Sequence, residues 1–166
     1  MGSPMGMRLA LVMVPPQHVA ELQRDGQRVQ ALLTDAAATA PDARLKMDKE
    51  WHGIHFLLRG DAWSNDGPYG QAVLGGTDIG PDLGYGPARL LNADEVAEIA
   101  AALAGVPIDG LRSRYNPVAM GEFVYPGVWE AEGDEALVWL LAGFRQLADF
   151  YARAAAGGNA VLLAVY

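Results

Sequence analysis

The C-terminal stretch DEALVWLLAGFRQLADFYARAAAGGNAVLLAVY, residues 134–166, decides the fold. Apolar side chains recur at helical spacing through residues 134–156, and the acidic residues at the start suit the helix dipole. Gly157–Asn159 interrupt this pattern. The continuous apolar run Ala160–Tyr166 that follows is typical of a buried strand. The stretch therefore predicts a long helix followed by a final strand.

Two more apolar runs predict strands that join this one. Met7–Val14 reads MRLALVMV and is ended by Pro15 and Pro16, and Pro87–Leu91 is a second short run. Strands at both ends of a small domain are expected to pair in one sheet with helices packed against it. The predicted fold class is therefore α+β, with a small mixed or antiparallel sheet that contains the N- and C-terminal strands and packs against several helices, including the long C-terminal one.

The regions between these strands favour helices. Asn92 and Glu95 match a capping box, in which each side chain accepts a hydrogen bond from the backbone of the other, and Gly105 ends that helix. A helix is also expected over Leu45–Leu58, with Gly60 as its C-cap. Shorter helices are expected around residues 19–25, 29–33 and 107–115.

The segment Gly60–Gly86 is rich in glycine, aspartate and asparagine, and it predicts a long loop broken by a short helix at Tyr69–Leu74. The segment matches neither of the common glycine-rich phosphate-binding motifs. Its aspartates do not have the spacing of a calcium loop. Turn formation is the simplest reason for its composition, although long ordered loops often carry function.

Composition excludes several classes of function. The 12 basic and 20 acidic residues give a net charge of −8, which disfavours nucleic acids and anionic membranes as partners. Cysteine is absent, so thiolate metal sites, disulfides and cysteine nucleophiles are excluded. We expect a single cytoplasmic domain over residues 5–166, with residues 1–4 as a tag remnant or a disordered extension.

Three motifs, in this order and spacing, resemble one bacterial family. They are DKEWHGIHFLL at residues 48–58, GYGPAR at residues 84–89, and Tyr125-Pro126 followed by the long helix with Phe150-Tyr151. The chain resembles the YfbM-like family, domain of unknown function 1877, over nearly its whole length. This resemblance implies a small cytoplasmic bacterial α+β domain and implies no catalytic residues.

Two sets of side chains are candidates for a functional site. Asp48, His52 and His55 lie close to one stripe of the predicted helix and are candidate metal ligands, but the spacing departs from the zincin motif. The alternative is that His55 is a core histidine with a hydrogen-bond partner and that His52 faces solvent or a neighbouring loop.

The second set, the candidate ligand-binding residues, combines an arginine with aromatic and acidic side chains: Arg89, Tyr85, Tyr125, Trp129 and Glu122. A guanidinium beside aromatic rings can anchor a carboxylate or a phosphate. The alternative is structural, with Arg89 in a salt bridge to an acidic residue of the loop and the aromatic rings filling the core.

The sequence favours a non-catalytic binding module for a protein partner or a small ligand, because no nucleophile motif is complete. The alternatives are a metal-assisted enzyme that uses His52 and His55, and a small-molecule site built around Arg89 and the aromatic residues. No cofactor is expected. The chain is expected to be a monomer or a homodimer, since the broad apolar stripe of the last helix can exceed what one small sheet covers.

Overall fold

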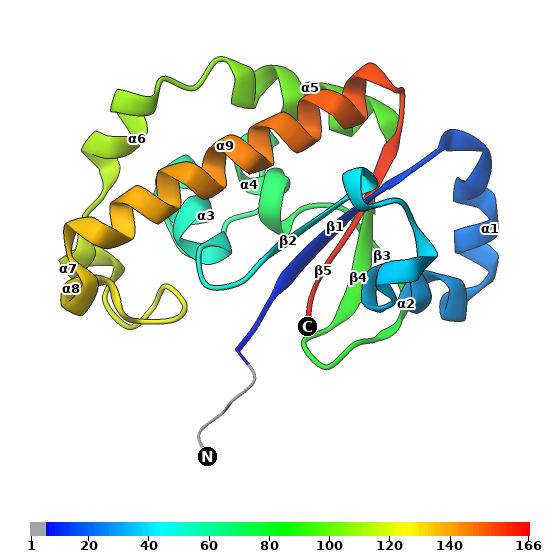
Figure 1. Ribbon diagram of the computed structural model, residues 1–166, viewed down its shortest axis with the longest axis horizontal. Coiled ribbons are helices and arrows are strands. Elements are labelled where there is room, and N and C mark those ends of the chain that lie inside the picture. The colour runs from blue at the N-terminus through cyan, green and yellow to red at the C-terminus, as the bar shows by residue number, and fades with distance from the viewer. Residues whose placement is uncertain (1–5) are drawn as a thin grey trace.

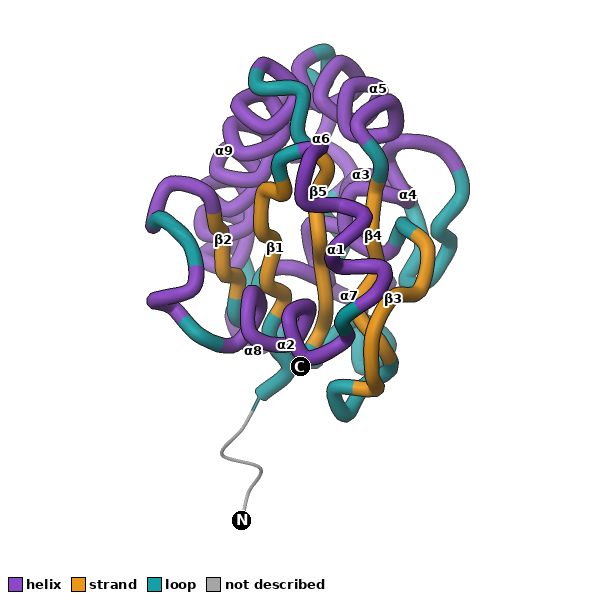
Figure 2. Tube along the Cα trace, turned by 90° about the vertical axis from the view of Figure 1, so that its right-hand side faces the viewer, coloured by secondary structure: helices purple, strands orange, loops and turns teal. Residues whose placement is uncertain are grey.

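The computed structural model describes residues 6–166, so the expectation for residues 1–4 lies outside it. Its centre is a sheet with the strand order β2-β1-β5-β4-β3, which Figure 2 shows nearly face on. All neighbouring strands are antiparallel, so of the two expected alternatives, a mixed or an antiparallel sheet, the structure has the antiparallel one. The strands are β1 (Leu9–Val14), β2 (Arg44–Met47), β3 (Thr77–Asp82), β4 (Pro87–Leu91) and β5 (Ala160–Val165).

The first and last strands pair at the middle of this sheet. Leu11 of β1 lies opposite Leu163 of β5, and the register continues to Val14 opposite Ala160. Both strands are apolar almost throughout, as expected where helices cover both faces of a sheet. The pairing of the terminal strands predicted from the sequence is confirmed.

Helices cover both faces of the sheet, so the domain has three layers (Figure 1). Strand alternation turns Leu9 and Leu11 toward the large helical layer and Ala10 and Val12 toward the small one, which α1 and α2 form. The helices are α1 (Val19–Arg24), α2 (Gly26–Thr34), α3 (Trp51–Arg59), α4 (Gly67–Leu74), α5 (Ala93–Ala104), α6 (Ile108–Arg114), α7 (Pro117–Met120), α8 (Trp129–Glu132) and α9 (Asp134–Ala156), with 3₁₀ turns at Pro16–His18, Ala36–Ala38 and Pro41–Ala43.

The two helices with the clearest sequence signals form as predicted. At the start of α5, Asn92 Oδ1 accepts from the Glu95 amide at 2.8 Å, and Glu95 Oε1 accepts from the Asn92 amide at 2.9 Å. The long helix α9 buries one stripe across the sheet and ends at Gly157. Within residues 6–166, no helix has both the length and the apolar content that a membrane crossing requires.

Two segments differ from the sequence prediction. The first part of the expected helix Leu45–Leu58 is strand β2, because Met47 pairs with Leu9 at the start of β1, and the helix begins only at Trp51. The segment Gly60–Gly86 holds the predicted short helix as α4, but it also contains the edge strand β3, which pairs with β4. In both cases pairing with a distant strand overrides the local pattern.

Candidate functional site

Arg89 is the one charged residue of strand β4, which reads PARLL. It alternates with Ala88 and Leu90, so it points to the same face of the sheet as Leu91, toward the large helical layer. Its Nη1 donates to the Gly75 carbonyl at 2.7 Å, and its Nη2 donates to the Val73 carbonyl at 3.3 Å. Arg89 therefore caps the C-terminal end of α4 from inside the protein.

The guanidinium of Arg89 makes no ion-pair contact in the described chain, although its cross-strand partner on β3 is Asp78. Within the described chain, no Asp or Glu oxygen lies within 4.0 Å of its nitrogens, and Asp78 acts on it only at longer range. The salt bridge expected as the structural alternative is therefore not formed by residues 6–166. Burial lowers the pKa of Arg89, but an arginine stays protonated at neutral pH.

A pocket of about 390 Å³ opens beside Arg89, at the end of the sheet where β1 and β4 begin and β5 ends. Arg89 is the one charged residue among its described lining residues, and most of the others are aromatic or aliphatic. The pocket is lined by Met7, Trp51, Trp63, Leu74, Tyr85, Pro87, Arg89 and Val165. Trp63 and Tyr85 stand at its mouth, exposed by 62% and 60%.

His52 holds the wall of this pocket in place. Its Nδ1 accepts a hydrogen bond from the Tyr125 amide at 2.8 Å, so its Nε2 carries the proton and donates to the Ala62 carbonyl at 2.7 Å. The imidazole stacks on Trp51 with ring centres 4.9 Å apart and contacts Trp63 at 4.3 Å. Burial lowers the pKa of His52, and protonation would require loss of the Tyr125 hydrogen bond.

His55 is fully buried one helical turn further along α3. Neither of its ring nitrogens has a hydrogen-bond partner among the described residues, and its Nε2 lies 3.8 Å from Asp61 Oδ1. Burial, assisted by the charges of His52 and Arg59 and opposed by Asp61, lowers the pKa of His55 to about 4. The expectation of a core position is met, but the expected hydrogen-bond partner is not found in residues 6–166.

The three candidate metal ligands do not converge. The expectation that His52 faces solvent or a loop holds only for the loop, because the side chain is fully buried and both nitrogens bind backbone groups. Asp48 pairs instead with Arg8, with Asp48 Oδ1 3.2 Å from Arg8 Nε. Across residues 6–166, no three His, Cys, Asp or Glu side chains gather in a way that could hold a metal ion.

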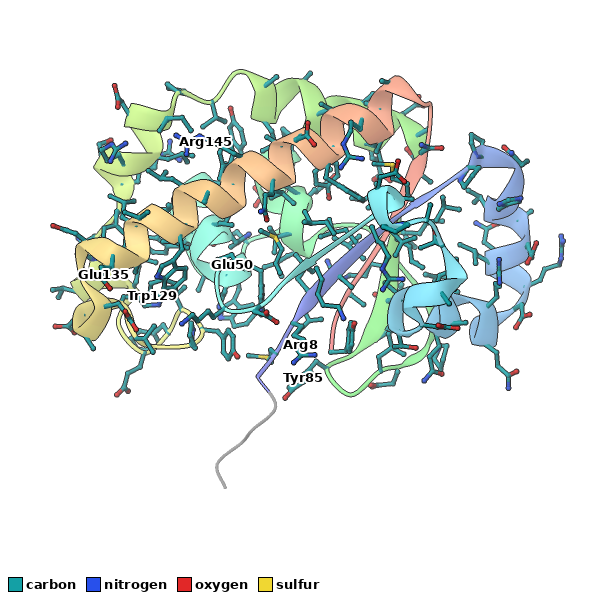
Figure 3. All side chains as sticks on the ribbon, in the orientation of Figure 1. Arg8, Glu50, Tyr85, Trp129, Glu135 and Arg145 are labelled. Atoms are coloured by element: carbon teal, nitrogen blue, oxygen red, sulfur yellow. The ribbon has the colours of Figure 1, made fainter. Side chains whose placement is uncertain are left out.

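The structure brings together some of the predicted ligand-binding residues. Arg89 and Tyr85 line the same pocket, and Tyr125 lies behind it, stacked on Trp51 with ring centres 5.8 Å apart. Trp129 is buried beneath α9, away from Tyr85 (Figure 3), and its indole N–H donates to the Val124 carbonyl at 2.7 Å.

Glu122, the remaining predicted residue, is exposed on the turn after α7 and does not line this pocket. Six of the eight described lining residues were not predicted as site residues: Met7, Trp51, Trp63, Leu74, Pro87 and Val165. Met7 and Trp51 have the spacing of core residues, and Trp63 lies in a segment that reads as an ordinary turn. No local sequence signal identifies Trp63, because only the folded chain brings its ring against His52.

Comparison with known proteins agrees with this architecture. The structure is similar to the crystal structure of YfbM from Escherichia coli, described as a protein of unknown function, with a TM-score of 0.75 and 22% sequence identity. The similarity covers 96% of this chain and 99% of that one. No curated protein matches the chain. The model of the family called "Domain of unknown function (DUF1877)" matches residues 5–164. The chain therefore belongs to the DUF1877 family.

Proposed function

We propose that this protein is a binding module for a small organic anion with an apolar body, and that the pocket beside Arg89 is its site. One observation carries the proposal: a partly buried guanidinium without an ion-pair partner in the described chain lines a pocket with aromatic walls. The pocket volume of about 390 Å³ falls within the range of small-molecule sites. That volume favours a small ligand over the protein partner that the sequence also allowed.

The charge of the pocket supports an anion. Aromatic boxes can also bind organic cations, but the fixed positive charge of Arg89 would repel one. The two carbonyl contacts of Arg89 engage Nη1 and Nη2, and a guanidinium has five N–H donors, so donors remain for a carboxylate. A single arginine matches a monoanionic group better than a doubly charged phosphate.

The walls support an apolar or planar ligand body. Trp63 and Tyr85 offer exposed aromatic rings, while the buried Trp51 ring and the aliphatic side chains of Met7 and Leu74 complete the apolar lining. Burial of apolar ligand surface against such walls contributes roughly 25 cal/mol per Å². Two of the rings are already more than half exposed at the mouth, so they are accessible to a ligand.

The surroundings of the pocket support binding without catalysis. His52 is the nearest histidine to the wall, and both of its nitrogens are hydrogen-bonded to the backbone. A general base needs a nitrogen or carboxylate within hydrogen-bond reach of the substrate. The lining residues described for the pocket include no histidine, carboxylate or serine.

Calorimetric titration with octanoate and phenylacetate tests the proposal. Wild-type protein is expected to bind at least one of them, and Arg89→Gln is expected to weaken binding tenfold or more, since a hydrogen bond to a charged group contributes about 1.5–3 kcal/mol. Arg145→Gln, which removes the same charge from an exposed position on α9, is the matched control and should change the affinity less than twofold.

A second variant keeps the test valid if Arg89→Gln unfolds the protein. Trp63 is 62% exposed, so Trp63→Ala should fold normally and weaken binding by loss of one wall. Circular dichroism establishes that each variant is folded. Equal affinity of wild type, Arg89→Gln and Trp63→Ala would contradict the proposal, as would a wild-type protein that binds neither compound.

A further inference from the structure

A second cavity of about 350 Å³ adjoins the Arg89 pocket. Its described lining residues are Gly6, Arg8, Leu83, Tyr85 and Tyr166, so Tyr85 is shared by both cavities. Figure 3 shows Arg8 and Tyr85 close to one another at the foot of the sheet, as expected for two residues that line one cavity.

The two cavities lie on opposite faces of the sheet at the same end. Met7 and Val165 line the first cavity and pack against the core of the large helical layer. Tyr166 and Leu83 line the second and pack against the core of the α1–α2 layer. A molecule that occupies both cavities must therefore pass over the strand ends beside Tyr85.

The turn that carries Tyr85 is fixed by its own hydrogen bonds. Asp82 Oδ1 accepts from the Gly84 amide at 2.7 Å and from the Gly86 amide at 3.3 Å, and the Leu83 amide donates to the Gly86 carbonyl at 2.9 Å. Gly84 and Gly86 have φ values of 114° and 103°, which favour glycine strongly. The backbone thus holds the Tyr85 ring between the two cavities.

Among the residues described, the second cavity, like the first, is lined by a single charged residue, and that residue is an arginine. Arg8 is the one charged residue in its described lining, although the chain carries 20 acidic and only 12 basic residues. Arg8 Nε is paired with Asp48 Oδ1 at 3.2 Å, and both side chains are about half or more exposed. Exposed ion pairs of this kind are weak, so an incoming acid group can compete with Asp48.

We infer that the ligand carries two acid groups separated by an apolar spacer, with one group bound by Arg89, the other by Arg8, and the spacer lying against Tyr85. This inference rests on the proposed function and specifies the ligand of the same site. Without a contact to Arg8, the second acid group would lower the affinity, because an unpaired carboxylate loses hydration in the second cavity and is repelled by the acidic protein.

Titration of the full chain with alkanoates and α,ω-alkanedioates of equal carbon number, from six to fourteen carbons, tests the inference. At the spacer length that spans the two arginines, we expect the dicarboxylate to bind about tenfold more tightly than the alkanoate. Shorter dicarboxylates should bind more weakly than the matching alkanoates.

Variants separate the two arginines. Arg8→Gln should reduce dicarboxylate affinity to or below that of the alkanoate and leave alkanoate affinity unchanged, whereas Arg89→Gln should weaken both. Asp48→Asn should raise dicarboxylate affinity severalfold, because the competing carboxylate is removed. Both Arg8 and Asp48 are exposed enough that these variants should keep the wild-type Tm.

The outcomes distinguish this inference from the proposed function. If alkanoates bind through Arg89 but no dicarboxylate exceeds them, the second acid group is refuted and the proposed function stands. The same conclusion follows if Arg8→Gln affects both ligand series equally. If neither series binds at any length, both the inference and the proposed function are overturned.

Discussion

Replacement of His55 by leucine should make the protein more resistant to acid. His55 is fully buried on α3, and neither ring nitrogen has a hydrogen-bond partner in the described chain. Burial is the main cause that lowers its pKa from 6.5 to about 4, with His52 and Arg59 acting in the same direction and Asp61 opposing them. The folded protein therefore holds this imidazole neutral under conditions in which the unfolded chain protonates it.

The size and sign of the effect follow from proton linkage. Between pH 6.5 and about 4, the unfolded chain binds a proton at His55 that the folded chain excludes, so stability falls as the pH falls through this window. With those two pKa values, wild type should lose about 2 kcal/mol from this residue between pH 8 and pH 5. His55→Leu removes this loss, and it also removes two buried polar atoms without partners.

Urea denaturation followed by tryptophan fluorescence at pH 8, 7, 6 and 5 measures the effect. The difference in unfolding free energy between His55→Leu and wild type should grow by about 2 kcal/mol from pH 8 to pH 5. His18→Leu is the matched control, since His18 is an exposed histidine, and it should show the same pH dependence as wild type. Parallel pH profiles for His55→Leu and wild type would refute the reasoning.

Three further substitutions and one control test local contacts that stabilise the fold. Asn92→Ala removes the capping box and should lower stability by about 1 kcal/mol in thermal or urea unfolding, with α5 otherwise intact. Gly53→Ala should cost about 1–3 kcal/mol, because the new Cβ would lie 2.6 Å from the Trp129 ring, whereas Gly105→Ala, with 3.7 Å to its nearest neighbour, should be near neutral by the same measurement. Tyr151→Phe should cost about 1 kcal/mol, because its hydroxyl donates to the Ala72 carbonyl at 2.6 Å; an unchanged Tm would show that this bond contributes nothing.

Local sequence signals predicted the parts of the fold in which one segment determines its own conformation. The capping box fixed the start of α5, and the run at Ala160–Tyr166 indicated a buried strand, which the structure places at the centre of the sheet. The short strand Arg44–Met47 could not be recognised, because its polar and apolar residues also fit a helix. Only pairing with β1 makes it a strand.

The sequence predicted an arginine and aromatic rings at the candidate site, but it did not identify most of the residues that line the pocket. Arg89 and Tyr85 were predicted because a guanidinium beside aromatic rings can anchor a carboxylate or a phosphate, and both line the pocket. Trp63 could not be assigned, since its place in the pocket depends on the bonds that His52 makes to two loops far apart in sequence. Trp129 was predicted together with Tyr85 as an aromatic residue of the same site, but it is buried in the core.

The four tryptophans allow a direct test of the central claim, that the Arg89 pocket is the binding site. In a ¹⁵N-labelled sample, each indole N–H gives its own NMR signal, which Trp→Phe variants assign. On titration with octanoate, the signals of Trp51 and Trp63 should shift, while those of Trp129 and Trp139, which do not line the pocket, should stay in place. No shift at saturating octanoate, or shifts confined to Trp129 and Trp139, would contradict the account.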